Sequence, residues 1–136
     1  MMSNVAIVEA FINALISWDT ETAPGHLDNY VQVSAPADLP MDGEYIGKAA
    51  FLDFCRKVTS TFEVEIDHRR VLDTGEVVLA VIDSSWTARR TGASIRTQVC
   101  GRFTVSDGKI TAINGFPNDT RALYEITVEP DANRPH

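Results

Sequence analysis

The spacing of apolar residues changes once along this chain, near residue 62, and the change restricts which folds it can adopt. Before that point apolar residues recur at steps of three and four, the period of an amphipathic helix. After it, apolar and polar residues alternate, the period of a strand with one buried face. Helices followed by a run of strands predict an α+β domain and not alternating βαβ units.

Two long helices are predicted in the first half of the chain. One covers residues 5–18 and the other follows Gly47 and ends near residue 61. Between them, Pro24 is placed to open a short helix, and residues 30–34 alternate like a strand. Prolines and a glycine between residues 36 and 43 indicate an irregular loop.

The second half predicts strands joined by short glycine-containing turns. Three consecutive hairpins imply an antiparallel meander without crossover helices. We therefore expect a curved antiparallel sheet with the helices on one face. The predicted strands are 62–72, 76–89, 94–105 and 109–116.

Length and charge narrow the class of partner. The 136 residues suit one domain, and 44% of them are hydrophobic. Nineteen acidic against twelve basic residues give a net charge of −7, which disfavours binding to a phosphate backbone. No apolar run is long enough to cross a bilayer, and the N-terminus lacks the basic start of a signal peptide. We expect a cytoplasmic protein with no nucleic-acid or membrane partner.

Cysteines and histidines are few. Cys55 and Cys100 are too few for a disulfide framework, and buried thiols are the simplest interpretation, with a disulfide or a reactive thiol as the alternatives. The three histidines are too scattered for a zinc site. We predict no metal and no cofactor.

The order of elements and one closing stretch resemble a known superfamily. Trp18 and Asp19 end the first helix, and Gly43 to Gly47 lead into the long one. The segment 101–110, Gly-Arg-Phe-Thr-Val-Ser-Asp-Gly-Lys-Ile, is followed by Phe116 and Asp119. These features resemble the SnoaL-like and ketosteroid-isomerase-like branch of the nuclear-transport-factor-2-like superfamily. The resemblance covers residues 4–119.

The resemblance implies a cone in which the sheet curls over the long helix around an apolar pocket. The domain would be residues 1–119, with a tail of partial order at most over residues 120–136. Many members of the superfamily dimerise through the outer sheet face, so we expect a homodimer. That face would carry Arg96, Gln98, Arg102 and Trp86.

The catalytic groups of the superfamily are mostly missing. Where ketosteroid isomerases have their tyrosine and two aspartates, this chain has Phe11, Ala35 and Gly101. Of the three positions used by limonene-epoxide-hydrolase-like members, only Asp83 keeps its carboxylate. The others are Val81 and Asn114. In polyketide cyclases of the SnoaL type the base also falls at the asparagine, and an amide cannot act as a base.

A smaller set of candidate catalytic residues remains. If the strand faces that point inward are those the resemblance implies, Asp83 and Asn114 approach each other inside the apolar cone. The alternation of Phe62, Val64, Ile66 adds His68 to them. Asp83 would then be the acid/base group, Asn114 would hold a substrate oxygen, and His68 or Tyr30 would assist. The sequence does not decide which face of the strand 76–89 lines the pocket, because its even-numbered residues are as apolar as its odd-numbered ones.

Two functions follow. The first is binding of a small apolar, carbonyl-bearing molecule, with proton-transfer chemistry of the isomerase, cyclase or hydratase type. The second is a non-catalytic ligand-binding or protein-interaction module that keeps the cone without catalytic groups. The residues predicted to line the pocket are Phe11, Trp18, Tyr30, Tyr45, Phe51, Phe54, Val81, Phe103 and Phe116.

Overall fold

The computed structural model describes residues 2–17, 19–36 and 39–128. The elements are α1 (Asn4–Ile16), a 3₁₀ helix η1 (Ala23–His26), β1 (Leu27–Ala35), β2 (Gly43–Ile46), α2 (Lys48–Thr61), β3 (Phe62–Asp73), β4 (Val77–Ala88), β5 (Ser94–Ser106), β6 (Lys109–Pro117) and α3 (Thr120–Val128). The described strands form one sheet in the order β2-β1-β6-β5-β4-β3.

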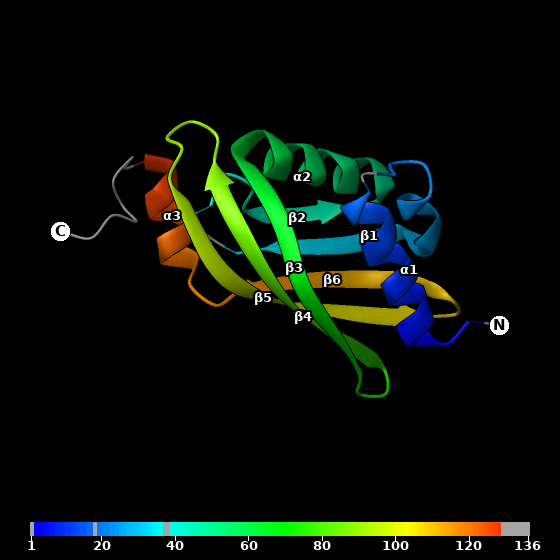
Figure 1. Ribbon diagram of the computed structural model, residues 1–136. Coiled ribbons are helices and arrows are strands. Elements are labelled where there is room, and N and C mark those ends of the chain that lie inside the picture. The colour runs from blue at the N-terminus through cyan, green and yellow to red at the C-terminus, as the bar shows by residue number, and fades with distance from the viewer. Residues whose placement is uncertain (1, 18, 37–38, 129–136) are drawn as a thin grey trace.

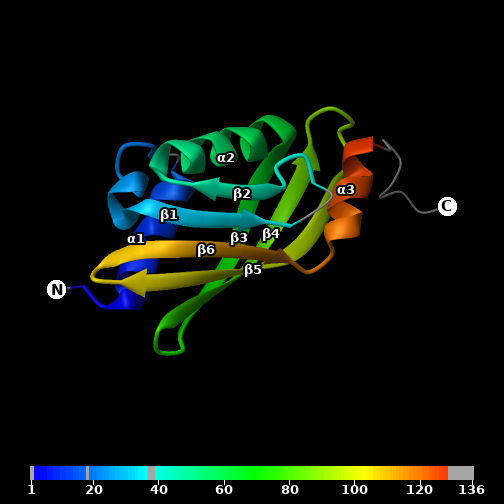
Figure 2. The ribbon, with the colours of Figure 1, turned by 180° about the vertical axis from the view of Figure 1, so that it is seen from behind.

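The sheet is strongly curved and does not close. Figure 1 shows α1 and α2 on one side of it, and the view from behind shows β1 and β6 in front of α1, with α2 beyond β2 (Figure 2). This confirms the predicted α+β fold with the N-terminal helices on one face of a curved sheet. We call the side that α1 and α2 cover the concave face, and the other side the outer face.

Local sequence explains where the helices begin. The Ser3 hydroxyl accepts a hydrogen bond from the Ala6 amide at 3.1 Å and caps α1. α2 begins after Gly47, whose φ of 94° lies in a region that residues with a Cβ rarely adopt. Both predicted helices are therefore present, and η1 occupies the position expected for the short helix.

The meander from β3 to β6 is antiparallel throughout, as predicted. Asp107 and Gly108 turn from β5 to β6 with φ values of 52° and 76°, as a two-residue hairpin requires. At the other side of the sheet β1 pairs with β6 in parallel, and β2 pairs with β1. Strand β2 was not predicted, because its glycine and the preceding prolines resemble a loop.

Two β-bulges interrupt the alternation of faces. Ile66 pairs with Ser84 but His68 pairs with Asp83, so Asp67 is the extra residue in β3. In the hairpin of β5 and β6, Thr104 pairs with Ala112 and Val105 with Ile110, so Thr111 is extra in β6. Beyond each bulge the side chains change face.

The core consists of two clusters. The larger lies between the sheet and α1 and α2, where the Phe11 ring packs 5.6 Å from Phe51 and 6.0 Å from Phe103. The smaller contains Leu123 and Ile126 of α3, both almost fully buried. The first nine residues of the predicted tail thus form a packed helix. None of the described helices is long and apolar enough to span a membrane.

Candidate functional site

Asp83 lies on the outer face of the sheet. Along β4 the even-numbered residues Val78, Ala80 and Ser84 are buried on the concave face, and the odd-numbered residues point the other way. The Asp83 carboxylate accepts a hydrogen bond from Nε2 of the exposed Gln98 at 3.0 Å. The expected inward position of Asp83 and Val81 is therefore wrong. Strand β4 is apolar on both faces, and the helices cover the face formed by its even-numbered residues.

His68 and Asn114 are also displaced, each by a bulge. His68 follows the extra residue of β3 and pairs with Asp83 on the outer face, away from Phe62 and Val64. Asn114 follows the extra residue of β6 and pairs with Arg102. Asp83 and His68 are thus neighbours as predicted, but outside the cone. The catalytic role given to these three residues stays a prediction.

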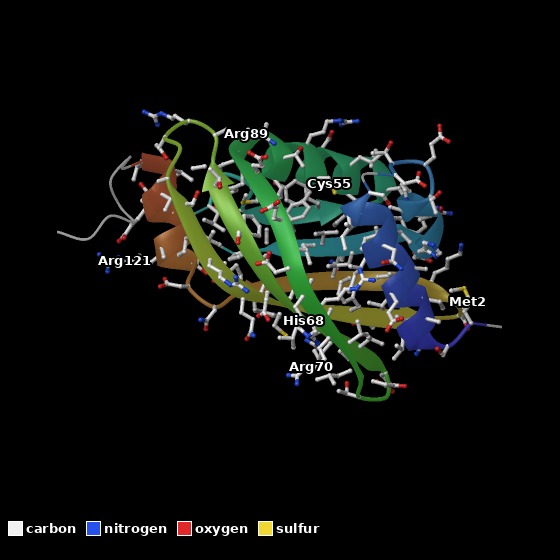
Figure 3. All side chains as sticks on the ribbon, viewed as in Figure 1. Met2, Cys55, His68, Arg70, Arg89 and Arg121 are labelled. Atoms are coloured by element: carbon white, nitrogen blue, oxygen red, sulfur yellow. The ribbon has the colours of Figure 1, made fainter. Side chains whose placement is uncertain are left out.

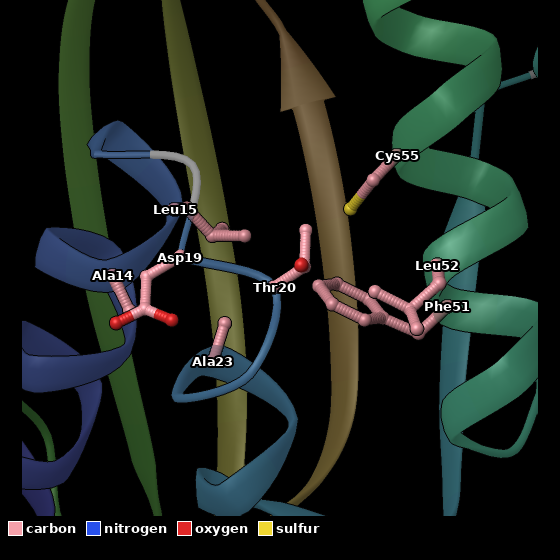
Figure 4. A pocket seen from close by; sticks show the side chains of 8 residues that line it. All are labelled: Ala14, Leu15, Asp19, Thr20, Ala23, Phe51, Leu52 and Cys55. Carbon is pink, nitrogen blue, oxygen red and sulfur yellow. The ribbon is translucent and has the colours of Figure 1, made fainter.

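Three of the predicted lining residues fill the interior of the cone with their own rings. Phe11, Phe51 and Phe103 have exposed fractions of 1%, 2% and 5%. Between α1 and α2 the side chains of Leu15, Thr20 and Cys55 converge, as Figure 4 shows. The remaining space there is about 10 Å³, roughly what one water molecule needs. A ligand does not fit in this part of the molecule.

The other predicted lining residues separate. Tyr30 is 80% exposed, and Phe116 is 55% exposed on the outer face. Together with Asn114, Phe116 borders a hollow of about 190 Å³ at the end of β6. Tyr45 is buried, and its hydroxyl donates to the Met41 carbonyl at 2.9 Å. Trp18 lies outside the described residues. Among the predicted lining residues that the structure describes, Phe54 is the one that lines the space described next.

A larger cavity opens between the C-terminal end of α1, α2, and strands β3 and β4. We call it the groove. Its volume is about 440 Å³, within the range of small-molecule sites. It is lined by Leu15, Ile16, Phe54, Cys55, Val58, Thr59, Phe62, Glu63, Val64, Ile66, Trp86 and Arg89. Apolar side chains predominate, and the charged ones, Glu63 and Arg89, are exposed.

The indole N–H of Trp86, in the wall of the groove, is already paired. Trp86 donates its indole N–H to Ser84 Oγ at 2.8 Å, and that hydroxyl donates to the Thr97 carbonyl at 3.2 Å. The Trp86 ring packs edge-on against Phe62 at 5.1 Å. Trp86 therefore belongs to the concave face and not to the outer face, where it was predicted. At the rim, Arg89 Nε donates to the Thr59 carbonyl at 2.6 Å.

Cys55 contributes a buried thiol to the groove. Burial raises its pKa from 9.0 to about 12, because the thiolate would lose its hydration. The thiol therefore stays protonated at neutral pH and acts as an apolar surface. Both cysteines are free, Cys55 buried and Cys100 half-buried. No cluster of three or more metal-ligating side chains occurs within the described part of the chain.

Sequence reasoning missed most of the groove, although part of its signal was visible. The alternation of Phe62, Val64 and Ile66 predicted one apolar face of β3, and that face lines the groove. Val58 and Ile16 could not be linked to it, because nothing in the sequence shows how α1 and α2 cross the edge of the sheet.

Comparison with known proteins identifies the family. The SnoaL-like domain profile matches residues 8–113, so the chain belongs to the SnoaL-like domain family. This confirms the resemblance drawn from the sequence. No curated protein of known function matches the chain significantly.

Solved structures show the same nuclear-transport-factor-2-like fold. A protein of this fold from Burkholderia pseudomallei is 18% identical, with a TM-score of 0.83 over 93% of this chain and 99% of its own. TerC, co-crystallised with polyporic acid, is 20% identical, with a TM-score of 0.81 over 91% and 97%. A Pseudomonas putida protein provisionally named a polyketide cyclase is 17% identical, with a TM-score of 0.74 over 85% and 92%.

Proposed function

We propose that the protein binds a small, largely apolar molecule in the groove. The observation that carries this proposal is the contrast between two spaces. The interior beside Phe51 retains about 10 Å³, whereas the groove retains about 440 Å³ with mostly apolar walls. An unfilled apolar concavity of this size favours a ligand whose apolar surface leaves water on binding. The co-crystal of TerC with polyporic acid supports a ligand-binding role for this fold.

We place binding ahead of proton transfer. Asp83, His68 and Asn114 follow the outer-face register of their strands, and none of them lines the groove. The buried Cys55 thiol is held protonated and is a poor base at neutral pH. These positions favour the non-catalytic ligand-binding alternative over acid/base chemistry by the predicted trio.

A pair of matched substitutions tests binding in the groove. Val64 lines the groove on β3, and Val81 lies on the outer face of β4. Val64→Trp fills the groove and is expected to weaken binding of 2-ethylnaphthalene at least tenfold by calorimetric titration. Val81→Trp places the same side chain outside and should leave the dissociation constant unchanged.

Two outcomes would contradict the proposal. One is that 2-ethylnaphthalene and related bicyclic hydrocarbons do not bind the unaltered protein. The other is that both tryptophan variants bind the probe as the unaltered protein does. If Val81→Trp alone lost binding, the site would lie on the outer face and not in the groove.

We also propose that the protein is a homodimer through the outer face. Arg96, Gln98 and Arg102 are exposed there as predicted, and they are joined by two large apolar side chains. Those are Leu72, 41% exposed, and Phe116, 55% exposed. Mixed apolar and arginine surfaces are typical of protein interfaces. Light scattering should give the mass of a dimer for the unaltered protein and of a monomer for Phe116→Asp. A monomeric unaltered protein would contradict this.

A further inference from the structure

A second hollow adjoins the groove where α1 crosses β3. Its volume is about 330 Å³, and it is lined by Asn13, Ile16, Ile66, Asp67, His68 and Arg69. Ile16 and Ile66 line the groove as well, so the two spaces lie on either side of these side chains. The groove is apolar, and this hollow brings together an amide, a carboxylate, an imidazole and a guanidinium group.

The bulge of β3 turns Arg69 toward the helix. Because Asp67 is extra, Arg69 pairs with Ile82 on the concave face, whereas its neighbour Arg70 pairs with Val81 on the outer face. Arg69 Nη2 donates to the Asn13 side-chain oxygen of α1. Arg69 Nη1 is buried and has no hydrogen-bond partner among the described residues.

The nearby acidic group is engaged elsewhere. Asp67 Oδ2 lies 3.5 Å from Arg96 Nη2 and accepts a hydrogen bond from Ser85 at 3.4 Å, both on the outer face. Within the described chain Arg69 forms no ion pair. An arginine stays charged at all physiological pH values, and a buried N–H of a charged group without an acceptor is costly. No described protein atom pairs with the Arg69 Nη1 donor, and an oxygen acceptor would satisfy it.

We propose that the ligand of the groove supplies this acceptor: a carboxylate or carbonyl oxygen that binds Arg69 while the apolar body lies in the groove. The inference rests on the proposed function and specifies its ligand class. A guanidinium N–H to a carboxylate is a charge-assisted hydrogen bond, stronger than one to a neutral carbonyl. The expected order of affinity is carboxylate, then carbonyl, then hydrocarbon.

Three probes with one apolar body test the order: 2-naphthoate, 2-acetylnaphthalene and 2-ethylnaphthalene. For the unaltered protein, calorimetric titration should show 2-naphthoate binding about tenfold or more tightly than 2-ethylnaphthalene, with 2-acetylnaphthalene between them. Arg69→Met keeps the length of the side chain and removes the donors. In this variant the three dissociation constants should converge on that of the hydrocarbon.

Arg70→Met is the matched control, since it removes the same charge one residue away on the opposite face. It should keep the preference for oxygen-bearing probes. Arg69→Lys replaces Arg69→Met in the binding comparison if the methionine variant does not fold. It keeps the charge but lacks the guanidinium fork, so 2-acetylnaphthalene should lose its advantage over 2-ethylnaphthalene.

Stability of the free protein separates ligand binding from a structural role. Arg69→Met removes the unpaired buried donor together with the exposed hydrogen bond to Asn13, two effects of opposite sign, so the melting temperature of the free protein should change little, while 2-naphthoate no longer raises it. Equal binding of all three probes, or an oxygen preference that Arg69→Met and Arg69→Lys both keep, would overturn the inference and leave the groove in place. Failure of 2-ethylnaphthalene to bind at all would instead contradict the proposed function.

Discussion

At the scale of single residues, the buried thiol of Cys55 beside the groove has a pKa well above its ordinary value. It projects from α2 into the space between α2 and α1 (Figure 4). Its raised pKa means that the folded protein holds the proton more tightly than the unfolded chain does. The stabilising effect is therefore complete below pH 9 and is lost as the pH rises toward 12.

This gives a prediction for alkaline unfolding. Between pH 8 and pH 11 the unaltered protein should lose roughly 2 to 3 kcal/mol more unfolding free energy than Cys55→Ala, since each unit of pKa difference is worth about 1.4 kcal/mol. Urea denaturation at several pH values measures the difference between the two proteins. Parallel losses in both would show that the thiol is not desolvated.

At residue scale, side-chain direction also explains why Asp83, His68 and Asn114 lie outside the cone. The helices, turns and antiparallel pairing were predictable because each depends on a few neighbouring residues. An extra residue such as Asp67 or Thr111 has no such local signature, yet it moves every later side chain to the other face. The register thus places His68 and Arg70 on the outer face, and Figure 3 labels both on the lower part of β3 (Figure 3).

At the scale of elements, the hairpin of β5 and β6 depends on one missing side chain. Gly101 pairs with Gly115, and the Phe103 ring lies over it on the concave face. A Cβ at Gly101 would come within 2.8 Å of Phe103 Cε2, whereas a Cβ at Gly115 would meet nothing within 4 Å. The closing stretch of the family resemblance therefore has a packing reason for beginning with glycine.

The paired glycines provide a matched test of this packing. Gly101→Ala should lower the unfolding free energy by about 1 to 3 kcal/mol, because the Phe103 ring must shift against Phe11. Gly115→Ala should change it by less than about 0.5 kcal/mol. Chemical denaturation of both variants measures these changes in unfolding free energy. Equal changes would show that the Phe103 ring does not constrain residue 101.

At the scale of the whole molecule, the two faces of the sheet differ in what they carry. The concave face carries the helices, the filled core and the groove, and the outer face carries the arginines with Leu72 and Phe116. The sequence predicted the curved sheet and the covering helices correctly. It could not show that Phe11, Phe51 and Phe103 would close the centre of the cone and leave the open space at the β3 edge, because that outcome depends on how three separate elements pack.

Amide chemical-shift mapping by NMR would locate the bound ligand on the protein. On titration with 2-ethylnaphthalene, we expect the largest shifts at Val58, Val64 and Trp86 around the groove. Asp83 and Phe103, on the outer face and in the closed core, should shift little. Shifts concentrated around Asp83, or spread along the outer face, would contradict a ligand site between α1, α2, β3 and β4.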